Sequence, residues 1–193
     1  MEYILSEVKN RIDAHLRQKD RVLVAIDGNS GAGKSTLAAQ LKKQYSCNLF
    51  HMDDFFLPKE LKTKERLLEA GGNVHYERFL DEVIGGIISG NVFEYQTYNC
   101  SIASLDKTIK IDPNRLNIIE GVYSCHPVLM QYYDLKIFLK VSEKEQSKRI
   151  LNRNGAFMHQ RFIEEWIPLE NMYFNKMHIE SLCDPVFDVT TGI

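Results

Sequence analysis

The chain has 193 residues, of which 44% are hydrophobic and 26% are charged, and its formal net charge is −2. This balance is typical of a globular protein, and the length favours a single domain over residues 1–193 with a lid at most. Because there is no excess of basic residues, nucleic acid is not expected as a main partner.

The cysteines and the apolar runs indicate in which cellular compartment the protein is expected. The four cysteines form no Cys-x-x-Cys pair, which argues against a zinc site or a disulfide framework. The acidic start of the chain does not resemble a signal peptide, and the longest apolar runs are strand-sized, so no membrane span is expected. We therefore expect a cytoplasmic protein with no membrane partner, and homo-oligomer formation stays open. The cysteines are Cys47, Cys100, Cys125 and Cys183.

Hydrophobic periodicity predicts an alternation of helices and strands. Residues 2–19 have apolar positions at helical spacing, and residues 21–27 form a β-branched run typical of a strand buried on both faces. The pattern predicts an α/β fold, with a parallel sheet of about five strands sandwiched by helices. Further strands are expected at 47–52, 116–120, 135–141 and 185–190, and further helices at 34–44, 62–70, 76–89, 127–132 and 143–153.

Two segments depart from this alternation. In residues 92–111 polar and other residues alternate, which predicts a small antiparallel excursion off the main sheet. Near the C-terminus, an aromatic and apolar stripe at helical spacing predicts a long helix with a kink at Pro168. We expect this stripe to pack in the core rather than to bind a cofactor. Its members are Phe162, Trp166, Leu169 and Tyr173.

A glycine-rich run between the first buried strand and the next helix matches the pattern Gly-x4-Gly-Lys-Ser. Glycines let such a loop wrap its N–H groups around phosphate oxygens, and the following helix adds the positive end of its dipole. Lys34 is expected to bridge the β- and γ-phosphates, and Ser35 to place its hydroxyl on Mg²⁺. The ATP-binding residues predicted in this run are Gly28, Asn29, Ser30, Gly31, Ala32, Gly33, Lys34, Ser35 and Thr36.

Carboxylates follow two of the predicted strands, at the sheet edge where the phosphate loop also lies. Asp53 and Asp54 come after the strand at 47–52, and Glu120 ends the strand at 116–120. A phosphotransfer site needs acids for Mg²⁺ and a base for the acceptor hydroxyl. The spacing leaves open which aspartate is the base, and turn or helix-capping roles are the alternatives.

Basic residues on the helix predicted at 143–153 suit a lid over the phosphates. Arg149 and Arg153 are four residues apart and share a helix face, and a flexible turn is expected at residues 154–156 within a lid over about 153–161. A solvated helix face is the alternative. Among the histidines, His51 is expected to hydrogen-bond within the sheet, whereas His75 and His126 are candidates for substrate contact.

Three of these stretches resemble the uridine/cytidine kinase family, within the wider group of phosphoribulokinase-like P-loop kinases. They are the phosphate loop, His51–Phe56 and Ile118–Gly121, and the resemblance covers about residues 20–190. It implies a P-loop NTPase fold and ATP-dependent transfer to a hydroxyl of a small, sugar-containing acceptor. It also implies that Asp53 is the general base, Phe56 and Tyr98 line the substrate pocket, Glu120 is linked to the metal, and Arg149 and Arg153 belong to the lid.

The acceptor-reading residues of that family differ here. In uridine kinases the pocket tyrosine is followed by Asp and then by His and Arg, whereas Tyr98 is followed by Asn99–Leu105 with neither His nor Arg. The family's Asp-His-Pro stretch corresponds to Val74-His75-Tyr76. We therefore expect either an acceptor other than uridine or poor use of uridine. A P-loop NTPase without kinase activity and an ATP-binding protein are the alternatives, although no Asn-Lys-x-Asp typical of a GTPase is present.

Overall fold

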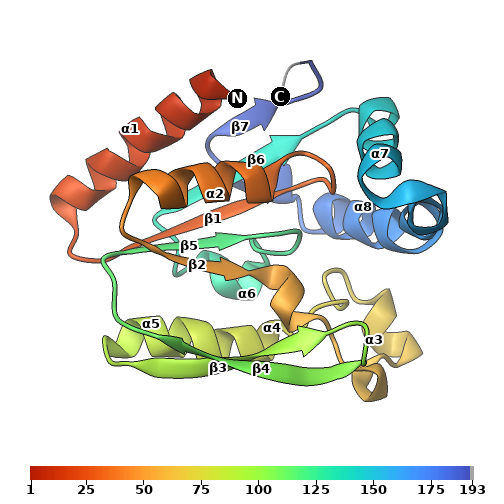
Figure 1. Cartoon of the computed structure of the whole chain (residues 1–193), viewed down its shortest axis with the longest axis horizontal. Helices are drawn as coiled ribbons and strands as arrows, with labels where there is room; N and C mark the ends of the chain where they lie inside the picture. Colours follow the sequence, from red (N-terminus) through yellow and green to blue (C-terminus); the bar gives the residue numbers. More distant parts are fainter. Residues whose placement is uncertain (192–193) are drawn as a thin grey trace.

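Five parallel strands form the main sheet of the computed structural model, which describes residues 1–191 (Figure 1). The sheet confirms the α/β fold and the five strands expected from the sequence, and each strand lies within two residues of its predicted range. In spatial order the strands are β2 (Asn48–His51), β5 (Leu116–Glu120), β1 (Val22–Gly28), β6 (Leu135–Lys140) and β7 (Val186–Asp188).

The central strand β1 separates two hydrophobic cores. Its seven residues are all buried, as the β-branched run predicts. Val24 and Ile26 face a core with α1 (Glu2–Gln18) and α2 (Lys34–Gln44), which cover that face of the sheet (Figure 1). Leu23 and Ala25 face the second core, because side chains alternate across a strand.

The second core is covered by shorter helical pieces. Residues 76–89 are helical throughout, because a π-helical segment at Phe79–Ile84 joins two short α-helices. The π-helical segment presents Phe79 and Val83 to the core, and α5 presents Ile87. The helices on this side of the chain are α3 (Lys64–Leu68), α4 (Tyr76–Arg78), α5 (Gly85–Ser89) and α6 (Pro127–Met130).

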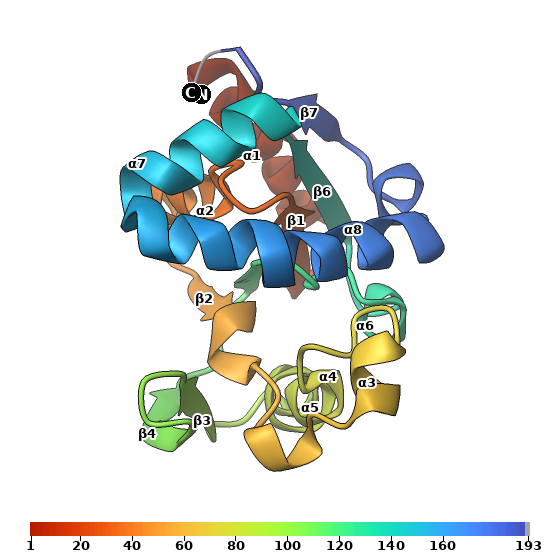
Figure 2. The same cartoon turned by 90° about the vertical axis from the view of Figure 1, so that its right-hand side faces the viewer.

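The antiparallel excursion predicted at 92–111 is a hairpin of β3 (Phe93–Asn99) and β4 (Ser104–Ile111). Tyr95 attaches it to the body of the protein, with its ring 5.9 Å from that of Phe50 and 5.4 Å from that of Phe55. The hairpin lies below the main sheet, next to the helical residues 76–89 (Figures 1 and 2).

The chain has a break between helical segments where a flexible turn was expected, at residues 154–156. α7 (Glu143–Arg161) breaks at Gly155, which has φ 75° and ψ 170°, and the chain is helical again directly afterwards. A π-helical segment at Phe162–Trp166 leads into α8 (Ile167–Lys176), whose first turn holds Pro168, where a missing N–H is tolerated. Within residues 1–191, no helix combines the length and the apolar character that crossing a membrane requires.

Candidate functional site

The phosphate loop joins the end of β1 to the start of α2. Gly31 and Gly33 have φ values of 78° and 91°, which favour glycine. At Gly28, with φ 135°, an added Cβ would lie 2.0 Å from the carbonyl oxygen of Leu139, so no side chain fits there. The loop therefore brings its N–H groups to the N-terminus of a helix, which is a ready anion-binding site.

Lys34 lies inside this loop, with 7% of its surface exposed. Its Nζ donates hydrogen bonds to the carbonyl oxygens of Gly28 at 2.7 Å and Asn29 at 2.9 Å. Asn29 in turn anchors the loop to β6 and the residue after it, because its N–H donates to Leu139 and its Oδ1 accepts from the N–H of Val141. The positive charge is thus held at the point where the loop closes.

Asp27 is a fully buried acid behind the loop that the sequence analysis did not single out. Its carboxylate accepts from the N–H of Gly28 at 2.7 Å, the N–H of Cys125 at 2.8 Å and the hydroxyl of Tyr173 at 2.8 Å. Burial nevertheless raises the pKa of Asp27 to about 6. This network links the first residue of the loop to α8, far along the chain.

Glu120 connects the phosphate loop to β2. Its Oε2 accepts from the hydroxyl of Ser35 at 3.1 Å, and its Oε1 lies 2.5 Å from Nδ1 of His51. His51 and Glu120 are register neighbours on β2 and β5, so the hydrogen bond expected for His51 within the sheet is present. That bond to the Glu120 carboxylate raises the pKa of His51. The histidine therefore holds the acid beside Ser35.

The side chains of the two aspartates after β2 lie in different surroundings. Asp53 faces the cavity described below and is accessible to solvent there. Desolvation by the surrounding protein raises its pKa, and the nearby Glu120 charge adds to the effect. Asp54 points instead toward the hairpin, where its carboxylate accepts from the hydroxyl of Tyr95 at 3.4 Å. Asp53 is thus the aspartate that shares a cavity with Lys34.

A cavity of about 1190 Å³ lies between two walls. The upper wall is formed by the phosphate loop, α7 and α8, and the lower wall by α3, the segment before it and the β3–β4 hairpin (Figure 2). Of the predicted ATP-binding residues, Gly28, Asn29 and Ala32 do not line the cavity and instead shape the loop from behind. Those that line it are Ser30, Gly31, Gly33, Lys34, Ser35 and Thr36.

The lower wall contains both pocket residues that the family resemblance implies, Phe56 and Tyr98. Beyond Tyr98 the hairpin offers small side chains to the cavity, those of Cys100, Ser101 and Ala103. Further lower-wall residues are Lys59, Lys62, Leu67 and Asn73.

The two candidate histidines, His75 and His126, do not line the cavity. His75 directly precedes α4, and its backbone N–H donates to the carbonyl oxygen of Phe55. His126 is buried and stacks on Tyr76 with ring centroids 4.0 Å apart.

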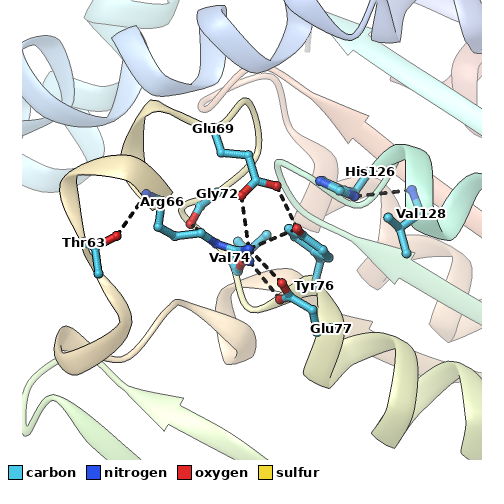
Figure 3. A network of polar contacts seen from close by, with 9 residues as sticks. All are labelled: Thr63, Arg66, Glu69, Gly72, Val74, Tyr76, Glu77, His126 and Val128. Atoms are coloured by element: carbon cyan, nitrogen blue, oxygen red, sulfur yellow. Dashed lines mark hydrogen bonds and ion pairs between the residues drawn. The ribbon is translucent and has the colours of Figure 1, made fainter.

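Arg66 holds together the part of the lower wall that comprises α3 and the turn after it (Figure 3). Its guanidinium donates to the carboxylates of Glu69 and Glu77, to the hydroxyl of Tyr76 and to the carbonyl oxygens of Gly72 and Val74. The same guanidinium lies 4.3 Å from the centroid of the Tyr76 ring. One side chain thus fixes the turn that carries Asn73 into the cavity.

The two arginines predicted to act together in the lid are separated. Arg153 lines the cavity, whereas Arg149 does not. The guanidinium of Arg149 donates to the carbonyl oxygens of Gly31 at 3.3 Å and Val189 at 2.7 Å, and Nε donates to Glu145 at 3.0 Å. These bonds tie α7 to the back of the phosphate loop and to the residue that follows β7, so Arg149 does not face the cavity as the expected lid role would require.

The aromatic stripe after Gly155 is also placed differently from the expectation of core packing. Tyr173 is fully buried, as predicted, but Phe162, Trp166 and Leu169 are partly exposed and line the cavity. The reason is that Phe162–Trp166 and the start of α8 face the cavity beside the phosphate loop, whereas Tyr173 lies further along α8 in the core. Glu170, which the sequence analysis missed, lies between these two parts and hydrogen-bonds to Ser30.

Comparisons with known proteins agree with this geometry. A uridine kinase from Ureaplasma parvum is 29% identical over 170 residues, which cover 78% of this chain and 79% of that protein. A probable uridine-cytidine kinase from Caenorhabditis elegans is 21% identical over 154 residues, covering 71% of this chain and 61% of that protein. A solved structure described as a possible uridine kinase from Bacillus stearothermophilus has a TM-score of 0.66 at 20% identity, covering 94% of this chain and 100% of that one.

The chain is similar in sequence to uridine kinases. It has the fold of the P-loop kinases, and the likeness to solved structures at this level of identity concerns the fold alone. No model of a known protein family matches the chain. Together, the fold, the phosphate loop and the uridine kinase-like relatives support an ATP-dependent kinase of a small molecule, without specifying its acceptor.

Proposed function

We propose that this uridine kinase-like protein transfers the γ-phosphate of ATP to a hydroxyl group of a small molecule other than uridine. The observation that carries the proposal is the meeting of Lys34, Asp53 and Glu120 at one cavity, whose opposite wall contains Phe56 and Tyr98. A cavity with a phosphate-binding loop on one side and the carboxylate of Asp53 beside it suits transfer between two bound molecules.

The residues have distinct roles in this proposal. The phosphate loop holds the β- and γ-phosphates with its N–H groups and Lys34. Asp53 accepts the proton of the acceptor hydroxyl, and its raised pKa makes the carboxylate a better base. Arg153, on the upper wall, balances charge on the transferred group. Phe56 and Tyr98 pack against the acceptor.

The acids at this site fit Mg²⁺. Glu120 and Ser35 already contact one another, and the charge of Glu120 raises the pKa of Asp53, so a divalent cation beside these groups would relieve their repulsion. Mg²⁺ would neutralise charge on the phosphates when bound. Within residues 1–191 no group of three or more His, Cys, Asp or Glu side chains could hold a metal on its own, which suits an ion held largely by a nucleotide.

The acceptor is proposed to differ from uridine because of the hairpin end. A site that reads a base uses polar partners for its edges, and such sites discriminate by orders of magnitude. After Tyr98, the side chains that face the cavity are those of Cys100, Ser101 and Ala103. Lys59, Lys62 and Asn73 provide other polar groups on the same wall.

The test is ATP consumption with and without a panel of hydroxyl compounds, including uridine, cytidine, pantothenate and sugar phosphates. We expect turnover that depends on an acceptor, with a higher kcat/KM for another compound than for uridine. ATP hydrolysis at the same rate with and without every acceptor would favour an NTPase, and binding without turnover would favour an ATP-binding protein. A kcat/KM for uridine of about 10⁴ M⁻¹s⁻¹ or more would contradict the acceptor assignment.

A further inference from the structure

Glu170 is a buried carboxylate in direct contact with the phosphate loop. The residue is 4% exposed, its Oε2 accepts from the N–H of Ser30 at 3.1 Å, and its Oε1 accepts from the hydroxyl of Ser30 at 2.5 Å. Burial raises the pKa of Glu170, and the charge of Lys34 and the bonds from Ser30 oppose that shift. A single loop residue thus satisfies both oxygens of a carboxylate that would be costly to bury without partners.

Together with Tyr173, Glu170 lets α8 restrain the loop at two points. The hydroxyl of Tyr173 bonds to Asp27, which accepts from the N–H of Gly28, and one helical turn earlier Glu170 bonds to Ser30. The loop contains Gly28, Gly31 and Gly33, and glycine-rich backbone has many accessible conformations. An external restraint on Ser30 therefore narrows the positions that the N–H groups after it can take.

We propose that Glu170 is a positioning residue for nucleotide binding, which holds Ser30 so that the phosphate loop keeps its anion-binding shape. The inference rests on the proposed function, because it assigns Glu170 to the same ATP site. α8 follows the segment Phe162–Trp166, part of which lines the cavity, so Glu170 also joins the loop to the wall that carries Arg153. If the carboxylate of Glu170 instead repelled the phosphates of ATP, Glu170→Ala would bind nucleotide more tightly than the wild type.

The experiment measures direct binding of a non-hydrolysable ATP analogue with Mg²⁺ by calorimetry, and thermal unfolding without nucleotide. Glu170→Ala should weaken binding about tenfold or more, because two hydrogen bonds to a charged group are lost. Glu170→Gln keeps one acceptor oxygen and should lose less. KM for the acceptor at saturating ATP should not change. Glu180→Ala is the matched control, since Glu180 is an exposed acid just after α8 that pairs with Lys140 at 3.0 Å.

A double-mutant cycle separates positioning from stability. Ser30→Ala removes the hydroxyl, so adding Glu170→Ala to it should weaken binding less than Glu170→Ala does in the wild type. If Glu170→Ala does not fold, the same double-mutant cycle is measured with Glu170→Gln in its place, alone and combined with Ser30→Ala. Unchanged affinity with a lower Tm, or tighter binding in Glu170→Ala, would overturn the inference alone. A wild-type chain that binds no nucleotide would overturn the proposed function as well.

Discussion

The hydroxyl of Tyr173 offers a direct test of the buried network behind the phosphate loop. Tyr173→Phe keeps the fully buried ring and removes the donor that reaches Asp27 at 2.8 Å. A hydrogen bond to a charged group is worth about 1.5–3 kcal/mol, and one between neutral groups about 0.5–1.5 kcal/mol. Because the pKa of Asp27 is about 6, the acceptor is charged at pH 8 and mostly neutral at pH 5.

The sign of the pH dependence follows from the raised pKa. The folded protein binds the Asp27 proton more tightly than the unfolded chain does, so stability from this group is full below about pH 4 and is lost as the pH rises through about 6. In the wild type that loss is about 3 kcal/mol. Tyr173→Phe removes a donor to the charged form, so the loss should be larger in the variant. We expect a destabilisation of about 2 kcal/mol at pH 8 and about 1 kcal/mol at pH 5.

Urea unfolding at the two pH values measures this difference, with equal m-values as the condition for comparison. Tyr133→Phe is the matched control, because its hydroxyl is buried in the same core without a hydrogen-bond partner among the residues that the structure describes. Tyr133→Phe should not lower the free energy of unfolding at either pH. The account of Asp27 would be refuted if Tyr173→Phe lost the same free energy at pH 5 and pH 8, or no more than Tyr133→Phe.

The remaining predictions concern catalysis and use the same activity assay. Lys34→Ala should lower turnover by orders of magnitude while leaving the fold intact, and near-normal phosphotransfer would contradict the phosphate-loop assignment. Asp53→Asn should lower kcat strongly with little effect on ATP affinity, whereas Glu120→Gln should raise the Mg²⁺ concentration needed for half activity. Arg153→Ala should lower kcat without lowering Tm, whereas Arg149→Ala should lower stability by about 1–3 kcal/mol through the loss of its backbone contacts; equal effects of the two changes would contradict their separation.

Patterns within short stretches of the sequence were enough to predict the sheet and the phosphate loop. β1 has a continuous buried run and Gly28–Ser35 has a fixed spacing, and both signals lie within a short stretch of chain. The positions of Asp53 and Glu120 followed from the rule that parallel strands end at one edge. The choice between Asp53 and Asp54 did not, because it depends on the hairpin tyrosine Tyr95, which pairs with Asp54.

Contacts between distant segments were beyond the sequence patterns. Glu170 and Ser30 are 140 residues apart, and Tyr173 and Asp27 are 146 residues apart, so no periodicity relates them. The one available signal in the sequence was Glu170 itself, an acid one helical turn before the aromatic Tyr173 on α8. The shared helix face of Arg149 and Arg153 was also misleading, because the end of β7 lies against Arg149 and the cavity opens beside Arg153.

The two walls of the cavity depend on different parts of the fold, and this bears on how acceptor specificity arises. The phosphate loop and the acid Glu120 lie at the ends of main-sheet strands, where the parallel register fixes their relative positions. The lower wall comes from the segment held by Arg66 and from the β3–β4 hairpin, and the strands of that hairpin pair only with one another. Changes in those two segments leave the main-sheet pairing intact. We therefore expect the difference from uridine kinases after Tyr98 to alter what the site accepts without altering the groups proposed to hold phosphate.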